Sequence, residues 1–252
     1  MLKIRVEQMR ALGLVSAGAF ESRLLERCRE YAPRLAALRG DSALRRTVRL
    51  GVDRASEHGF DLRGPVRFWV ETMLACGSGW HNDPQLARVT RALERRELQQ
   101  SFRADLVYEA LLAHLARTDG VDKCHARDAL QRILAIDWAA ALAPAPNPRQ
   151  RALSMMQSLH PAKAETIGPA ALEVLVTRAG EHCPRLAIDP GEGQVLLAGL
   201  MFGFGHEVLA DPMYPWVAAT LQPGRGSSAR RCRALARKTR LYVRAVLEHW
   251  SA

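Results

Sequence analysis

Residues 77–84 read GSGWHNDP, and residues 205–212 read GHEVLADP. Each stretch opens with a glycine and, after five intervening residues, closes with Asp-Pro, between two segments of helical periodicity. Glycine ends a helix by accepting a left-handed conformation, aspartate caps the next helix by accepting from its free N–H groups, and proline presets the φ of the first helical position. We therefore interpret six residues of the two stretches as structural caps: Gly77, Asp83, Pro84, Gly205, Asp211 and Pro212.

The two turns belong to a longer internal similarity. A shift of 128 residues aligns residues 23–93 with residues 151–221 without a gap, and 15 of the 71 aligned positions are identical. The identical pairs include Gly40 with Gly168 and Asp61 with Asp189, besides the glycines and Asp-Pro pairs of the turns. Self-similarity at a fixed offset is the sequence signature of a repeated structural unit. The sequence therefore predicts a tandem internal repeat.

Apolar residues recur at spacings of three and four along most of the chain, and alternating β-branched runs are missing. Residues 143–148 read APAPNP, and three prolines in that short a segment cannot continue a helix. The pattern predicts an all-α protein made of two related multi-helix units packed together. We expect residues 1–142 to form the first unit, residues 143–148 a proline-rich linker, and residues 149–252 the second.

Several helix limits can be predicted from start and stop signals. Asp41 resembles an N-cap for a helix that runs to His58 with Gly59 as its stop. Pro65 suits the first position of a helix that ends near residues 76–77. We expect two further helices at residues 101–116 and 122–142, and an amphipathic last helix of about 20 residues.

Composition excludes several classes of protein. The chain has 252 residues, of which 48% are hydrophobic and 25% charged, as in ordinary globular proteins. It contains no run of about 18 apolar residues that could span a membrane, and its first residues, MLKIRVEQMRAL, lack the apolar core of a secretory signal. We therefore expect a cytoplasmic protein without a membrane-spanning segment.

Catalytic and metal-binding motifs are missing from the sequence. The five cysteines are scattered without a C-x-x-C pair, and His206-Glu207 is not followed by the second histidine of an H-E-x-x-H zinc site. Neither a G-x-S-x-G nucleophile elbow nor a phosphate-binding loop is present. We expect no metal, no cofactor and no enzymatic activity. The alternative that stays open is an enzyme with an unrecognised acid/base site near His206 and Asp211, because acid–base pairs depend on geometry and not on sequence spacing.

The last helix carries a run of basic residues, and the whole chain has a formal charge of +10. From Arg225 the run continues without an acidic residue until Glu248. A positive potential favours nucleic acid or an acidic protein face as partner, whereas a solvated helix surface is the simpler interpretation. A basic helical nucleic-acid-binding protein is therefore a second alternative, less favoured because no zinc finger, basic zipper or RNP motif accompanies the run.

Several stretches resemble a known family. The segments LMFGFGH (200–206) and DPMYPW (211–216), the N-terminal IRVEQM (4–9), and Gly77 followed by Asp83-Pro84 are similar to a family of poorly characterised helical proteins encoded in bacterial type VI secretion gene clusters. In that family the loop often reads aromatic-Asp-x-Asp-Pro, whereas residues 80–84 here read WHNDP. The resemblance implies a role beside a spike protein, an adaptor and a toxin.

Together these observations predict a non-enzymatic protein-binding accessory of a type VI secretion system. The partner would be a secreted effector or its adaptor, bound by an effector chaperone or by an immunity protein that occludes the partner's surface. Arginines would steer the association. The expected partner-binding residues are Trp80, His81, His206, Tyr214, Trp216, Arg230, Arg233, Arg237 and Arg240.

Overall fold

The computed structural model describes residues 6–31, 33–143 and 146–250, and every regular element in these ranges is a helix. Residues 4–5 of the N-terminal stretch and residues 144–145 of the expected linker lie outside the described residues. The first six α-helices are α1 (Val6–Tyr31), α2 (Pro33–Arg39), α3 (Asp41–Glu57), α4 (Arg63–Cys76), α5 (Ala87–Leu93) and α6 (Gln100–Asp119). The other seven are α7 (Cys124–Ala135), α8 (Trp138–Ala141), α9 (Pro148–Leu159), α10 (Pro161–Arg185), α11 (Pro190–Phe204), α12 (Pro215–Leu221) and α13 (Ser228–Trp250).

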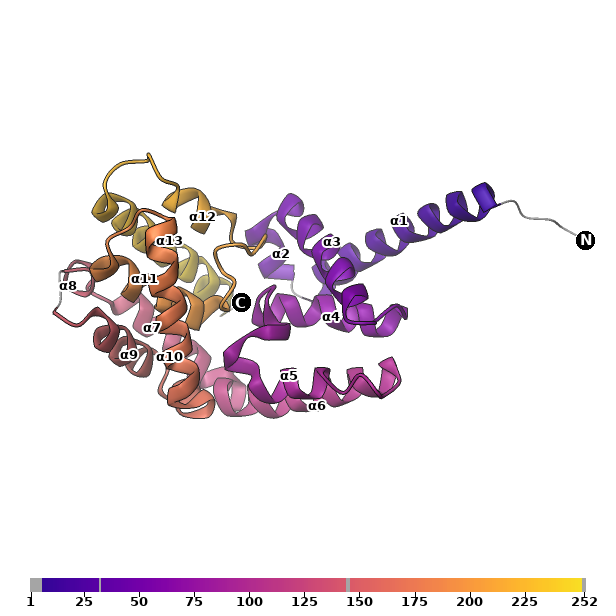
Figure 1. Ribbon diagram of the computed structural model, residues 1–252, viewed down its shortest axis with the longest axis horizontal. Coiled ribbons are helices and arrows are strands. Elements are labelled where there is room, and N and C mark those ends of the chain that lie inside the picture. The colour runs from indigo at the N-terminus through magenta and orange to yellow at the C-terminus, as the bar shows by residue number, and fades with distance from the viewer. Residues whose placement is uncertain (1–5, 32, 144–145, 251–252) are drawn as a thin grey trace, which may run out of the picture.

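The all-α prediction is confirmed for these residues, and three short 3₁₀ helices complete them: η1 (Trp80–Asn82), η2 (Pro84–Leu86) and η3 (Val121–Lys123). Helices α1 to α6 gather on one side of the molecule and α7 to α13 on the other, with α1 running outward from the first group (Figure 1). Helix α6 packs on α10, and α13 packs on α2, so both groups share an extensive boundary. None of the helices described combines the length and apolar character needed to cross a bilayer.

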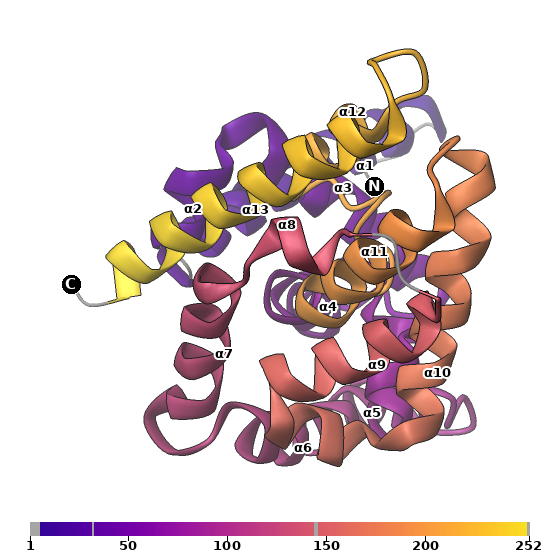
Figure 2. The same cartoon turned by 90° about the vertical axis from the view of Figure 1, so that its left-hand side faces the viewer.

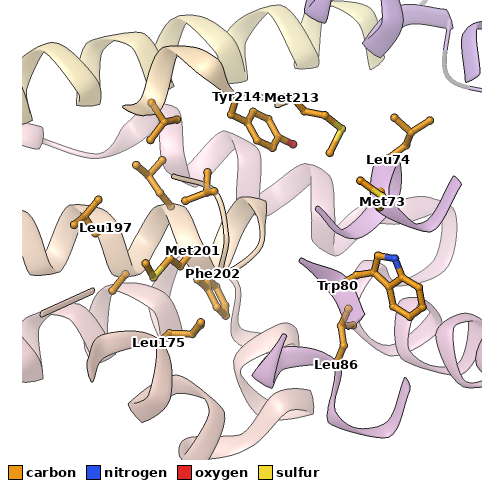
Figure 3. Close-up of a cluster of buried hydrophobic side chains, with 14 of the residues drawn as sticks. Met73, Leu74, Trp80, Leu86, Leu175, Leu197, Met201, Phe202, Met213 and Tyr214 are labelled. Atoms are coloured by element: carbon orange, nitrogen blue, oxygen red, sulfur yellow. The ribbon is translucent and has the colours of Figure 1, made fainter. Parts of the chain in front are cut away.

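One hydrophobic core runs through both groups of helices. Met73, Trp80 and Leu86 approach from α4, η1 and η2, and face Met201 and Phe202 of α11 (Figure 3). Met73 and Met201 have no exposed surface. Because apolar burial contributes about 25 cal/mol per Å², this shared core resists separation of the two groups.

Helix α13 follows the predicted amphipathic pattern. Cys232, Leu235, Ala236, Thr239 and Val243 are all buried along one side. Of the five cysteines, Cys28, Cys183 and Cys232 are buried, Cys76 is partly buried and Cys124 is exposed. Cys124 is therefore a surface residue, unlike the three buried cysteines.

Several predicted helix limits need correction. Asp41 is the first residue of α3 and makes no capping hydrogen bond, because Gly40 with φ 78° occupies the cap position. Pro65 is the third residue of α4 and not the first. The helix expected at residues 122–142 is interrupted, because Asp122 and Lys123 adopt positive φ and Ile136 is extended, which leaves η3, α7 and α8.

Candidate functional site

The two Gly…Asp-Pro turns meet at the centre of the molecule and exchange hydrogen bonds. Asp83 accepts the backbone N–H of His206 at 2.9 Å through Oδ2, and Asp211 accepts the N–H of Ser78 at 2.7 Å through its own Oδ2. His206 and Ser78 are the residues directly after Gly205 and Gly77. Each aspartate therefore holds the backbone of the opposite turn. We call the residues 77–84 and 205–212 together the turn junction.

The other oxygen of each aspartate holds its own turn. Oδ1 of Asp83 accepts the N–H of Gln85 at 2.8 Å, and Oδ1 of Asp211 accepts the N–H of Met213 at 2.8 Å. Both aspartates are almost completely buried, with 2% and 3% of their surface exposed. A buried carboxylate is tolerated only when its oxygens are hydrogen-bonded, and these bonds meet that requirement.

Glycine is required at both helix ends in the turn junction. Gly77 has φ 94° and ψ 158°, and Gly205 has φ 98° and ψ 148°, a conformation that is essentially restricted to glycine. A Cβ on Gly77 would lie 2.7 Å from the carbonyl oxygen of Phe204, and one on Gly205 would lie 2.8 Å from that of Cys76. The two backbones can cross this closely only without side chains.

The predicted caps are present at the first turn and altered at the second. Asp83 caps η2, with Pro84 in its first turn, and α5 follows from Ala87. Asp211 and Pro212 begin no helix, because α12 starts at Pro215. Tyr214, at φ −125° and ψ 50°, precedes α12 as Leu86, at φ −110° and ψ 30°, precedes α5, but residues 212–214 do not form the short 3₁₀ helix that residues 84–86 form. The interpretation of Asp211 as a helix cap is therefore wrong, although it does hold the local turn.

His206 lies inside the turn junction and is 7% exposed. Its Nδ1 is 3.2 Å from Oδ2 of Asp83, and Glu207 beside it forms an ion pair with Arg54 at 2.8 Å. Arg54 also donates to the carbonyl of Ser78 at 2.6 Å. These contacts tie α3 to both turns.

The two buried aspartates differ in their electrostatics. Burial acts to raise the pKa of Asp83, but contacts with His206 and the N–H of Gln85 hold that pKa below its ordinary value. Burial raises the pKa of Asp211, and the N–H groups of Ser78 and Met213 oppose this only in part. In the described part of the chain Asp211 has no imidazole beside it, and the charge of Arg39 lowers its pKa less than burial raises it.

Most aromatic residues expected at a partner surface lie inside the protein. Trp80 is 1% exposed and packs on Trp69 with ring centres 4.5 Å apart. Tyr214 is 6% exposed and accepts a hydrogen bond from Arg39 at 2.9 Å. His206 is buried as well. The prediction that Trp80, His206 and Tyr214 contact a partner is therefore wrong, because all three are buried within the protein.

His81 and Trp216 are partly exposed, so neither is fully withdrawn from the surface. His81 lies against His58 with ring centres 4.9 Å apart, and burial, together with nearby Arg54, lowers its pKa to about 4. Trp216 packs on Tyr242 with ring centres 5.9 Å apart. At neutral pH the His81 ring is therefore uncharged and half enclosed.

Most arginines of α13 remain at the surface. Five of them are exposed at spacings of three and four residues, which places them along one side of the helix. None forms an ion pair within the described part of the chain. Leu241 lies among them and is 58% exposed. We call the following set the arginine row: Arg230, Arg233, Arg237, Arg240 and Arg244.

Arg231 differs from the arginine row. It is 4% exposed and donates to the carbonyls of Leu186 at 2.7 Å and Ala187, and to that of Leu221 at 2.5 Å. It therefore fastens the start of α13 to the end of α10 and of α12. Sequence spacing alone does not separate this structural arginine from its exposed neighbours.

The sequence interpretation missed a group of polar residues around a cavity of about 300 Å³ between α4, α6, α7, α10 and α11. Lys163, His114, His160 and Gln85 all line it. Burial, with nearby Lys163, lowers the pKa of both histidines to about 4. Lys163 is one of only four lysines in the chain, and this rarity was the one feature of the sequence that could have marked it as a candidate site residue. Among the described residues, no three His, Cys, Asp or Glu side chains are placed to hold a metal ion.

The chain was compared with protein-family models, with curated proteins and with solved structures, and none of the three comparisons gave a match.

Proposed function

We propose that this chain is a non-enzymatic protein-binding accessory of a type VI secretion system. It would act in the cytoplasm on a secreted effector or its adaptor, as an effector chaperone or as an immunity protein. The assignment to type VI secretion rests on the sequence resemblance of residues 200–216 and of the first turn. The mode of action rests on the surface of α13.

The arginine row is the observation that supports protein binding most. Five guanidinium groups that have no carboxylate partner among the residues described create a positive strip, and the exposed Leu241 supplies an apolar contact within it. Arginine is enriched at interfaces because it forms bidentate bonds with carboxylates while its stem packs on apolar groups. An acidic protein face with an apolar centre matches this strip.

The turn junction supports a scaffold role for the residues that would otherwise suggest catalysis. Both aspartates have their oxygens occupied by backbone N–H groups, and His206 is enclosed beside Asp83. A general acid or base must reach a substrate proton. Buried groups already committed to the opposite backbone are poorly placed for that, so we assign function to the surface.

We also propose that the fold arose by tandem duplication with an offset of 128 residues. Residues 87–93 of α5 and 215–221 of α12 coincide under that offset. Gly40 separates α2 from α3, and Gly168 kinks α10, both with φ 78°. Of the expected linker at residues 143–148, Pro148 is the first residue of α9.

The proposal can be tested with the proteins encoded beside this one. Each is purified, and its affinity for this chain is measured by titration calorimetry at low and moderate salt. We expect one of them to bind, and the change Arg233→Glu/Arg237→Glu/Arg240→Glu to weaken binding at least about tenfold, since close charge pairs at interfaces couple by about 1.5 kcal/mol or more. A matched control, Arg45→Glu/Arg46→Glu/Arg91→Glu, changes the net charge equally at exposed arginines elsewhere and should leave the affinity within about twofold.

Other outcomes would contradict the proposal. Equal loss of affinity in both triple variants would show that only net charge matters. Binding to a random DNA duplex with a steep salt dependence, and to none of the neighbouring proteins, would favour the nucleic-acid alternative. If a toxin binds, loss of its activity in the complex identifies an immunity protein, whereas retained activity with improved solubility identifies a chaperone.

A further inference from the structure

The cavity of about 300 Å³ lies at the boundary between the two groups of helices, next to the turn junction. Helix α7 forms its outer wall and runs from the end of α6 to α13 (Figure 2). Ala129 is the one buried residue of α7, while the apolar residues Leu130 and Ile133 line the cavity and remain partly exposed. Its volume is at the lower end of the range of about 300–1,000 Å³ for small-molecule sites. A chamber lined by both apolar and polar side chains is therefore available to a small ligand beside α7.

Lys163 places a cationic group at this chamber. Its Nζ donates to the carbonyl of Phe202 at 2.5 Å and lies 4.9 Å from the centre of the Phe202 ring. No carboxylate lies within ion-pair distance of it in the described part of the chain. An ammonium carries three protons, so the single carbonyl leaves donors free. Asp83 and Asp119 also line the cavity and act on Lys163 only through space, so an anionic group that reached the ammonium directly would stabilise it further.

Gln85 supplies an independent indication of a ligand. It is 5% exposed, and its Nε2 donates to Oδ2 of Asp83 at 3.2 Å and to the carbonyl of Met201 at 3.0 Å. Both partners are acceptors, which fixes the orientation of the amide. Its Oε1 therefore remains buried on the cavity wall without a donor. A buried acceptor without a partner costs about 1–3 kcal/mol, which a hydroxyl group in the cavity would recover.

His160 adds a second donor at the same end. Its Nδ1 accepts the N–H of Lys163 at 3.2 Å, so the ring proton resides on Nε2. The ring packs edge-on against Phe202, on the same wall as the lysine. The cavity thus combines an apolar body, a cation with a neighbouring N–H donor, and one unfilled acceptor.

We propose that this cavity binds a small amphipathic carboxylate that carries a hydroxyl group, with the carboxylate at Lys163, the hydroxyl at Gln85 and the alkyl chain along α7. The Asp83 and Asp119 carboxylates in the lining disfavour a polyanion, whereas the single lysine suits one carboxylate. Tyr242 and Val246 of α13 line the cavity but no residue of the arginine row does, so ligand binding and the proposed protein binding can be tested independently.

The proposal can be tested with 3-hydroxyoctanoate as the probe and octane-1,3-diol as its uncharged analogue. Titration calorimetry on the full chain should give saturable binding of the acid, at least about tenfold tighter than that of the diol, as expected for a charge-assisted hydrogen bond. Lys163→Met should abolish this difference in affinity, while its affinity for the diol should stay within about twofold of that of the unmodified protein. Methionine matches the length of the lysine stem but leaves the Phe202 carbonyl without this donor, so the variant should fold with a somewhat lower melting temperature. Lys238→Met on α13 is the matched control and should bind both compounds as the unmodified protein does.

A second variant tests the location without touching the lysine. Ala126 of α7 lines the cavity and is partly exposed, so Ala126→Phe should fill the chamber and weaken both compounds at least about tenfold. The proposal is overturned if the acid does not bind, if acid and diol bind equally, or if Lys163→Met weakens both alike. Unchanged binding to a folded Ala126→Phe variant would also overturn it.

Discussion

Oδ2 of Asp83 lies 2.9 Å from the backbone nitrogen of His206, which is 123 residues further along the chain. The same bond is formed in the opposite direction between Asp211 and Ser78 at 2.7 Å. Two turns that are far apart in sequence are thus each completed by the other. Asp83 and Asp211, the two aspartates that most suggested catalysis, thus connect the two groups of helices through hydrogen bonds.

Substitution of the turn glycines should destabilise the fold. Gly77→Ala or Gly205→Ala would place a Cβ less than 3 Å from a backbone carbonyl at a φ above 90°, so each should cost about 2 kcal/mol or more. Gly203→Ala is the matched control, because its Cβ would have open space within a helix, and it should raise stability by about 0.5–1 kcal/mol. Chemical denaturation measures all three, and equal effects would contradict the close crossing.

The fastener role of Asp211 can be separated from a catalytic role. Asp211→Ala leaves the N–H groups of Ser78 and Met213 without acceptors, so we expect a loss of about 2–4 kcal/mol in unfolding free energy. Thermal denaturation measures this directly. An Asp211→Ala variant with unchanged melting temperature would instead favour the acid/base alternative.

Arg231 and Arg233 are two residues apart and should behave differently. Arg231→Met removes the donor to three carbonyls, and we expect it to cost about 2–4 kcal/mol. Arg233→Met changes only the exposed arginine row, so its free energy of unfolding should stay within about 0.5 kcal/mol of that of the unmodified protein. Denaturant unfolding of both variants tests the assignment, which a similar loss in each would refute.

Three histidines should make the protein sensitive to acid. Burial lowers the pKa of His81, His114 and His160 from 6.5 to about 4. Between these values the unfolded chain binds more protons than the folded one, so the stabilisation present above pH 6.5 is lost as the pH falls towards 4. After allowance for partial exposure, each histidine should lower the free energy of unfolding by on the order of 1 kcal/mol between pH 7 and 5.

His114→Gln isolates one of these contributions. The variant cannot take up a proton at this position, so its unfolding free energy should fall less between pH 7 and 5 than that of the unmodified protein. Other titrating groups, including Asp211, are common to both proteins and cancel in the comparison. Parallel pH profiles would show that His114 titrates normally in the folded chain.

Much of the fold could be predicted from local pattern. The apolar spacing at Cys232, Leu235 and Val243 marks the buried side of α13, and Gly77 marks the end of α4. Start signals were less reliable, because Asp41 follows a glycine that already occupies the cap position. Local chemistry therefore located helices better than it located their first residues.

The candidate site could not be predicted in the same way. Trp80 and Tyr214 have the composition of interface residues, and only three-dimensional packing shows that both are buried. Arg231 and Arg233 look alike in sequence although one is in the core. The hydrogen bond between Asp83 and His206 joins residues that are 123 positions apart, and helix or strand periodicity predicts no contact at that separation.

Amide hydrogen exchange at His206 and Ser78 tests the reciprocal hydrogen bonds between the two turns most directly. In the unmodified protein both amides should be strongly protected. Asp83→Ala should accelerate exchange at His206 beyond the change seen at the amides of α10, and Asp211→Ala should do the same at Ser78. If exchange at His206 followed the other amides in Asp83→Ala, the two turns would not be fastened by their aspartates.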